Sequence, residues 1–222
     1  MVTNEYRIRE NVDTIVIRTI TADVVILPGE EARVICLEEP KVTHKVAAEQ
    51  DTLLIDGKAN RKWYQFMGRQ RKGKVTVLLP KGEYKTLWIK STTGDVLISE
   101  GFTFETVDIS VTTGGVCVAG VHCQELTAGS TTGDLTMNHV IAKEKLTITG
   151  TTGHVALNAC DAAEVDIQVT TGNVKGTLLS EKTFEAKTVT GKVDVPKSRP
   201  GGLCKVHTTT GCIDLDIQQK DH

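Results

Sequence analysis

The sequence is poor in aromatic residues, in excess charge and in long hydrophobic runs. Aromatic side chains make up 4% of the chain, which leaves no row of rings on which nucleic-acid bases would stack. The net charge of −2 supplies neither a basic face nor an acidic tail. These shortages argue against a nucleic-acid-binding protein.

No apolar run has the form of a secretory leader or a transmembrane helix. The first residues, MVTNEYRIRENVDT, contain no apolar stretch, and no later segment has one long enough to span a bilayer. As written, the chain is therefore expected to have no transmembrane segment and to be cytoplasmic. A leader removed before this point would instead place it in the cell envelope.

Paired cysteine motifs are also missing. The six cysteines, at positions 36, 117, 123, 160, 204 and 212, form no Cys-x-x-Cys motif and no cysteine–histidine spacing suited to zinc. We therefore expect six reduced thiols, no metal and no cofactor. A disulfide or a metal site is the alternative that remains open.

What the chain does contain is a repeat. Thr-Gly pairs fall at 93–94, 113–114, 132–133, 152–153, 171–172, 190–191 and 210–211, which are steps of 19 or 20 residues. Four columns placed relative to each glycine are apolar, with the single exception of Gly176. Seven and five residues before the glycine they are Leu87, Val107, Leu126, Leu146, Val165, Phe184, Cys204 and Ile89, Ile109, Ala128, Ile148, Ile167, Ala186, Val206. Two and four after it they are Val96, Val116, Leu135, Val155, Val174, Val193, Ile213 and Ile98, Val118, Met137, Leu157, Gly176, Val195, Leu215.

Alternation of period two on both sides of each glycine predicts two half-buried strands per repeat. The inward positions are odd before the glycine and even after it, so the chain must turn a corner there, where glycine accepts a positive φ or a close backbone approach. One such corner per 19 or 20 residues predicts an all-β fold, a parallel β-helix or solenoid.

We expect three parts along the chain. Residues 1–86 form a degenerate first coil, with Ala22 at the glycine position, followed by a strand-rich capping segment; residues 87–217 form a regular β-helix of seven coils; residues 218–222 are a tail. Within the capping segment the strand-like stretches 32–37, 52–55 and 75–79 do not follow the repeat.

The segment from Lys58 to Lys74 mixes cations with aromatic side chains. One interpretation is a contact with an anionic surface or a protein partner, in which aromatic residues insert and cations pair. Its candidate contact residues are Arg61, Trp63, Tyr64, Phe66, Arg69, Arg71 and Lys72. The other interpretation is a solvated hairpin tip whose aromatic residues fold back on the solenoid.

Catalytic and calcium-binding patterns are weak. The outward column places Asp166 beside Glu185, and Asp194 precedes Asp214 by one repeat, but no column of aromatic residues suggests a sugar-binding groove. The column directly after the glycines is interrupted by Gly115, which argues against a stack of calcium ligands. We expect no catalytic residues.

The Thr-Thr-Gly-Asp-Val repeat (Thr92–Val96) and the preceding Leu-Pro-Lys-Gly turn (Leu79–Gly82) resemble a bacterial family of uncharacterised putative adhesins. The resemblance implies a parallel β-helix from an envelope or envelope-stress context. It favours a non-catalytic, adhesin-like or scaffolding protein whose ligand is unknown. A carbohydrate-active β-helix enzyme and a cytoplasmic scaffold for an envelope-stress membrane partner are the alternatives.

The last repeat ends at Ile217 with only a short polar tail after it. An uncovered terminal coil would expose its core and its unpaired backbone groups. We therefore expect Leu215 and Ile217 to form an edge that a second copy covers in a homodimer. The alternative is a monomer kept soluble by the charges around that edge.

Overall fold

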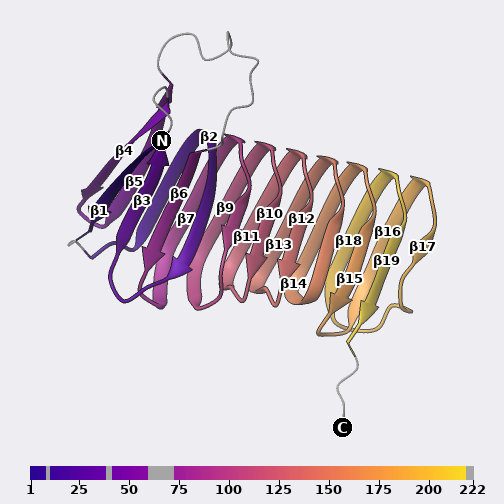
Figure 1. Ribbon diagram of the computed structural model, residues 1–222. Helices are drawn as coiled ribbons and strands as arrows, with labels where there is room; N and C mark the ends of the chain where they lie inside the picture. The colour runs from indigo at the N-terminus through magenta and orange to yellow at the C-terminus, as the bar shows by residue number, and fades with distance from the viewer. Residues whose placement is uncertain (9–10, 39–41, 60–72, 219–222) are drawn as a thin grey trace.

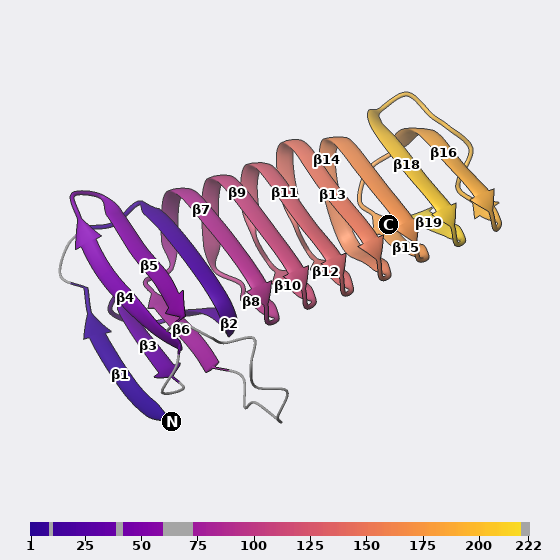
Figure 2. The ribbon, with the colours of Figure 1, turned by 90° about the horizontal axis from the view of Figure 1, so that it is seen from above.

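Two walls of strands, parallel except at the N-terminal end, face each other along a solenoid, and each coil of the chain contributes one strand to each wall (Figures 1 and 2). The computed structural model describes residues 1–8, 11–38, 42–59 and 73–218. The described residues contain strands and turns, and no helix among them could cross a membrane. The predicted all-β solenoid is therefore confirmed.

Each wall is named by its strands in spatial order. Wall B runs β4 (Val42–Glu49), β5 (Thr52–Ala59), the first half of β2 (Thr14–Pro28), β7 (Gly82–Thr93), β9 (Phe102–Thr113), β11 (His122–Thr132), β13 (Ile141–Thr152), the second half of β14 (Val155–Thr171), β18 (Gly202–Thr210) and β16 (Lys182–Thr190). Wall A runs β1 (Val2–Arg7), β3 (Arg33–Glu38), β6 (Gly73–Leu79), the rest of β2, β8 (Val96–Ile98), β10 (Val116–Ala119), β12 (Leu135–Asn138), the first half of β14, β15 (Val174–Leu178), β19 (Ile213–Ile217) and β17 (Val193–Asp194).

The Thr-Gly step is the corner that joins the two walls, as the sequence predicted. Gly133 has a φ of +148°, and a Cβ atom there would lie 2.0 Å from the carbonyl oxygen of Gly114 in the neighbouring coil. Its amide donates to the Thr152 carbonyl on the other side, at 3.0 Å. Only glycine fits a corner that combines this backbone conformation with such a close approach.

The first coil is also confirmed. Ile15 pairs with Leu87 and Val24 with Val96, so β2 stacks directly on the coil of β7 and β8 in the predicted register. The backbone of Ala22 packs against Gly94, at the glycine position of this coil.

The capping segment differs in part from the expectation. β5 and β6 pair in parallel with the two halves of β2, so they form one more coil, and residues 60–72 connect them at the corner position. The sequence does not show this coil as a repeat because residues 60–72 separate its two strands in the chain. Beyond this coil, β3 and β4 add antiparallel strands to the two walls, and β1 pairs with β3.

The order of the last two coils contradicts the sequence-based expectation. β18 lies between β14 and β16, and β19 lies between β15 and β17. The last coil of the chain is therefore the second-to-last coil of the stack. Leu215 is 3% exposed and packs in the core, so the prediction that Leu215 and Ile217 form the uncovered end is wrong.

The outermost coil at this end is formed instead by β16 and β17. The segment after β17 folds back over part of it: Phe184 donates its amide to the Ser198 hydroxyl, and Arg199 donates its amide to the Lys182 carbonyl. Val189 and Val193 remain exposed.

The core fills the space between the walls with the predicted apolar columns. All column residues are buried except five, which are half-buried or exposed: Gly176, Phe184, Ala186, Val193 and Val195. Four of these five belong to the outermost coil, where the inward side chains have a neighbouring coil on one side only.

Candidate functional site

In several coils the residue after the corner glycine bonds its own coil to the next one. Oδ1 of Asp134 accepts the amide of His154 at 2.7 Å, and Nδ1 of His154 accepts the amide of Asn173 at 3.1 Å. Oδ1 of Asn173 then accepts the amide of Cys212 at 2.8 Å. This column therefore supplies acceptors for corner amides, which explains its preference for Asp, Asn and His without a bound cation.

The first of the two expected carboxylate pairs is not adjacent. Because β18 lies between β14 and β16, Lys205 is in register with both Asp166 and Glu185 and separates them. The second pair is adjacent, since Asp194 pairs with Asp214. Oδ2 of Asp214 also lies 3.8 Å from Nζ of Lys175, and both side chains are exposed. Asp166 and Glu185 nevertheless line one shallow, open hollow, together with Gln168, Lys187, Lys205, Val206 and His207. Nε2 of Gln168 donates to Oδ1 of Asp166 at 3.3 Å, and Lys205 stands between the two carboxylates.

The basic and aromatic segment lies mostly outside the described residues. Of its candidate contact residues, Arg61, Trp63, Tyr64, Phe66, Arg69, Arg71 and Lys72 all fall within 60–72. The described strands place only its two ends, at Ala59 of β5 and Gly73 of β6, on the corner edge of the solenoid.

A shallow polar trough crosses wall B next to the corners. We call it the hydroxyl trough. It is lined by Ser110, Val111, Gly129, Ser130, Thr131, Thr149, Gly150, Thr151, Gln168, Val169, Thr170, His207 and Thr209. Gly129 lacks a side chain where its neighbours in the column carry Ser110 and Thr149, and this difference deepens the surface. One rim is the first threonine of successive Thr-Thr-Gly repeats, and these threonines are exposed.

The hydroxyl trough was missed by sequence reasoning, although its signal is present. The outward residues two before each glycine are Thr92, Thr112, Thr131, Thr151, Thr170, Val189 and Thr209. Stacked coils lie about 4.8 Å apart, so this column presents hydroxyl and methyl groups at a regular spacing. Such a surface offers hydrogen bonds to an extended polar ligand but no nucleophile–base pair.

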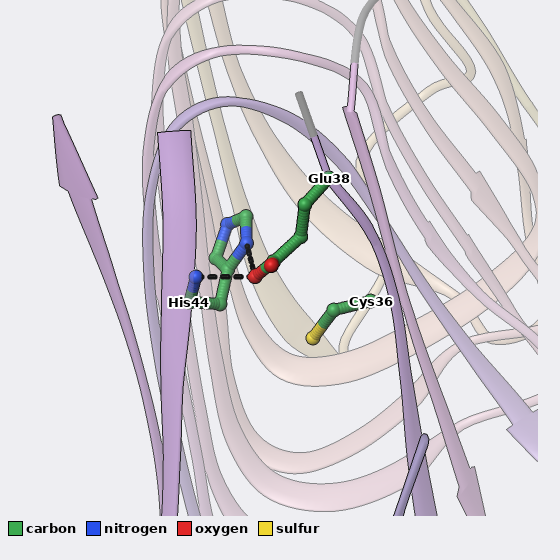
Figure 3. Close-up of side chains that lie close together, drawn as sticks. All are labelled: Cys36, Glu38 and His44. Carbon is green, nitrogen blue, oxygen red and sulfur yellow. Dashed lines mark hydrogen bonds and ion pairs between the residues drawn. The ribbon is translucent and has the colours of Figure 1, made fainter. Parts of the chain in front are cut away.

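A second cluster lies in the capping region, where Cys36, Glu38 and His44 converge (Figure 3). One donor atom from each lies within 4.8 Å of those of the other two. Oε1 of Glu38 is 3.3 Å from Nδ1 of His44 and accepts the His44 amide at 2.5 Å. Oε2 of Glu38 accepts from Nδ2 of Asn4 at 2.8 Å.

Burial controls the protonation of this cluster. Burial, and secondarily the Glu38 carboxylate, raises the pKa of the Cys36 thiol to about 12. Burial lowers the pKa of His44, although the hydrogen bond to Glu38 opposes that shift. At neutral pH the thiol is therefore protonated and the imidazole is neutral.

The geometry defines an all-β solenoid of stacked two-strand coils, with a polar outer face and a buried Cys-Glu-His cluster at one end. By sequence, residues 12–222 match the Toastrack DUF4097 family, and the chain belongs to that family. No curated protein sequence matches it.

Solved structures of similar proteins align with nearly the whole of this chain. A putative adhesin from Bacteroides fragilis aligns with a TM-score of 0.58 and 16% identity over 98% of this chain and 96% of its own. A putative cell adhesion protein from Clostridium sporogenes aligns with a TM-score of 0.43 and 11% identity over 98% of this chain and 99% of its own. At these identities the comparison with the Bacteroides protein shows the fold alone.

Proposed function

We propose that this protein is a non-catalytic, adhesin-like binding protein that contacts its ligand with the outer face of wall B. The observation that carries the proposal is the hydroxyl trough, in which exposed threonine, serine, glutamine and histidine side chains from successive coils form one continuous polar surface. The name of the similar structure from Bacteroides fragilis, a putative adhesin, agrees with a binding role.

The chemistry of this face favours an extended polar ligand. Hydroxyl and amide groups both donate and accept hydrogen bonds, and their repeat along the stack matches a ligand that itself repeats, such as a glycan chain. On this face Lys205 lies between Asp166 and Glu185, so a cation stands where a glycosidase needs open space for the sugar between its two carboxylates. A carbohydrate-cleaving activity is therefore the less favoured alternative.

A glycan array, followed by a panel of polysaccharide-cleavage assays, tests the proposal. We expect binding without cleavage. Thr151→Lys and Thr170→Lys place bulk and charge in the trough at exposed positions and should abolish binding, whereas Thr103→Lys, at an exposed position elsewhere on wall B, should not.

Two results would overturn the proposal. Release of products from any polysaccharide would favour the enzyme. Binding that survives both trough variants would place the ligand on another surface.

A further inference from the structure

The Cys36, Glu38 and His44 cluster connects the two walls at the capped end of the solenoid. Cys36 and Glu38 are two residues apart on β3, so they share its inward face. His44 lies on β4. β3 pairs with β6 in wall A and β4 pairs with β5 in wall B, so the donor atoms of the cluster come from opposite walls.

The cluster is closed to solvent and its hydrogen bonding is incomplete. Cys36 is fully buried, and Glu38 and His44 are each 5% exposed. Nε2 of His44 is buried and has no hydrogen-bond partner among the described residues, while Nδ1 is the ring nitrogen that lies beside Glu38. Figure 3 shows the Glu38 carboxylate between the His44 ring and the Cys36 thiol. A buried thiol alone commonly behaves as a small apolar side chain, but the Cys36 sulfur lies within 4.8 Å of a carboxylate oxygen and an imidazole nitrogen, an arrangement that can bind a metal ion.

The hydrogen-bond partners of the Glu38 carboxylate also indicate that a cation could bind here. Those among the described residues are Asn4, the His44 amide and the His44 ring, and none of them carries a fixed positive charge at neutral pH. A buried carboxylate without a cation is costly unless its charge is compensated.

We propose that Cys36, Glu38 and His44 bind one zinc ion. A thiolate sulfur, a carboxylate oxygen and an imidazole nitrogen are the donor types that zinc prefers, and three protein ligands leave a fourth position for water. Binding breaks the Cys36 S–H bond, forms a zinc–sulfur bond and releases one proton to solvent. The thiolate and the carboxylate together then balance the two positive charges of the ion, so the buried site is neutral.

The ion would tie wall A to wall B where the core has no further coil to cover it. Sequence spacing missed the site because one ligand is a glutamate and the histidine is on a separate strand. The available signal was Glu38 itself, a charged residue at the end of the inward column Val34, Cys36 and Glu38.

Cobalt(II) provides a direct test, because it substitutes for zinc and reports its ligands by absorption. Full-length protein dialysed against a chelator and then titrated with cobalt chloride should bind one equivalent, with a thiolate-to-cobalt charge-transfer band and visible bands of tetrahedral intensity. Zinc chloride should displace the cobalt and abolish both. One proton should be released per zinc bound, as measured with a pH indicator in weak buffer.

Matched variants assign the site. Cys36→Ser should lose the charge-transfer band and weaken zinc binding at least a hundredfold, while Cys123→Ser, another buried thiol in the solenoid, should keep both. Should Cys36→Ser fail to fold, Glu38→Gln replaces it, because an amide of the same shape retains an oxygen acceptor and removes the charge. Absence of a stoichiometric cobalt complex in the native protein, or a band unchanged in Cys36→Ser, would overturn the proposal.

Discussion

Nζ of Lys182 lies 2.6 Å from Oδ1 of Asp161, although a whole coil separates the two residues. The lysine is 2% exposed, and its ammonium group also donates to the Ser180 hydroxyl and the Ala162 carbonyl. It reaches Asp161 by passing over Gly202, the first residue of the inserted strand β18, where a Cβ atom would lie 3.1 Å from Nζ. This ion pair, in which the lysine is buried, links the coil of β14 to the coil of β16 across the inserted strand β18.

Removing the ammonium group should therefore weaken the fold. We expect Lys182→Met to lower the free energy of unfolding by about 3 kcal/mol, because Asp161 loses its cationic partner and keeps only neutral donors, and the Ser180 and Ala162 oxygens lose a donor. Urea denaturation measures the change. Lys187→Met, on the same strand but exposed, serves as the control and should be near neutral, within about 0.5 kcal/mol.

Gly202 should be intolerant of a side chain. A Cβ atom at this position would lie 2.4 Å from the Ala163 carbonyl oxygen, so Gly202→Ala forces the inserted strand away from β14. We expect a loss of about 2 kcal/mol. Gly82→Ala is the control, because a Cβ atom there meets nothing within 4 Å; equal effects of the two substitutions would contradict this explanation.

Experiments can distinguish the role of Leu215 in the core from a role of the outermost coil in association. Leu215→Lys introduces a charge into the core and should destabilise the protein by more than about 3 kcal/mol. If a homodimer forms through this end of the stack, Val189→Lys with Val193→Lys should dissociate it without loss of stability, since both valines are exposed. Light scattering at micromolar concentration measures the mass; a monomeric native protein rules out the dimer.

No two of the six cysteines are paired in the structure, and the burial of Cys123 and Cys204 predicts alkaline sensitivity. Burial raises the pKa of Cys123 and Cys204 to about 12, against an ordinary value of 9.0. Above pH 9 the unfolded chain loses these protons while the folded protein keeps them, so stability falls as the pH rises toward 12, by about 1.4 kcal/mol per pH unit for each thiol.

Urea denaturation at several alkaline pH values checks this slope. Cys204→Ala should make it shallower. Val165→Ala, a core substitution next to Cys204 in the stack, should lower stability equally at every pH, and an unchanged slope in Cys204→Ala would refute the assignment.

Contact of the basic and aromatic segment with an anionic surface stays a prediction. Sedimentation with phosphatidylserine vesicles should show binding that weakens as salt rises. Arg69, Arg71 and Lys72 changed together to Ala should reduce it about a hundredfold, at about 1 kcal/mol per cation. The control replaces three exposed cations of the distal coils, Lys175, Lys192 and Arg199. Binding that is independent of salt, or absent, would favour the solvated hairpin.

The sequence predicts the coil but not the order of the coils. Alternation and the Thr-Gly corner are local, so the inward columns can be identified without knowing which coil neighbours which. Every coil presents the same row of backbone donors and acceptors, and no periodic signal distinguishes a coil that follows its predecessor from one that is inserted. The distinguishing contacts, such as Gly202 against Ala163, involve single residues between segments far apart in the chain.

The position of the last coil also affects how the molecule would bear a load. In a stack built in chain order, tension on the final strand would peel away one ladder of hydrogen bonds at a time. Here β18 and β19 are each hydrogen-bonded on both sides. β19 is bonded to β15 along its whole length and to β17 at Ile213 and Asp214, so force applied at β19 must rupture part of a second ladder together with the first.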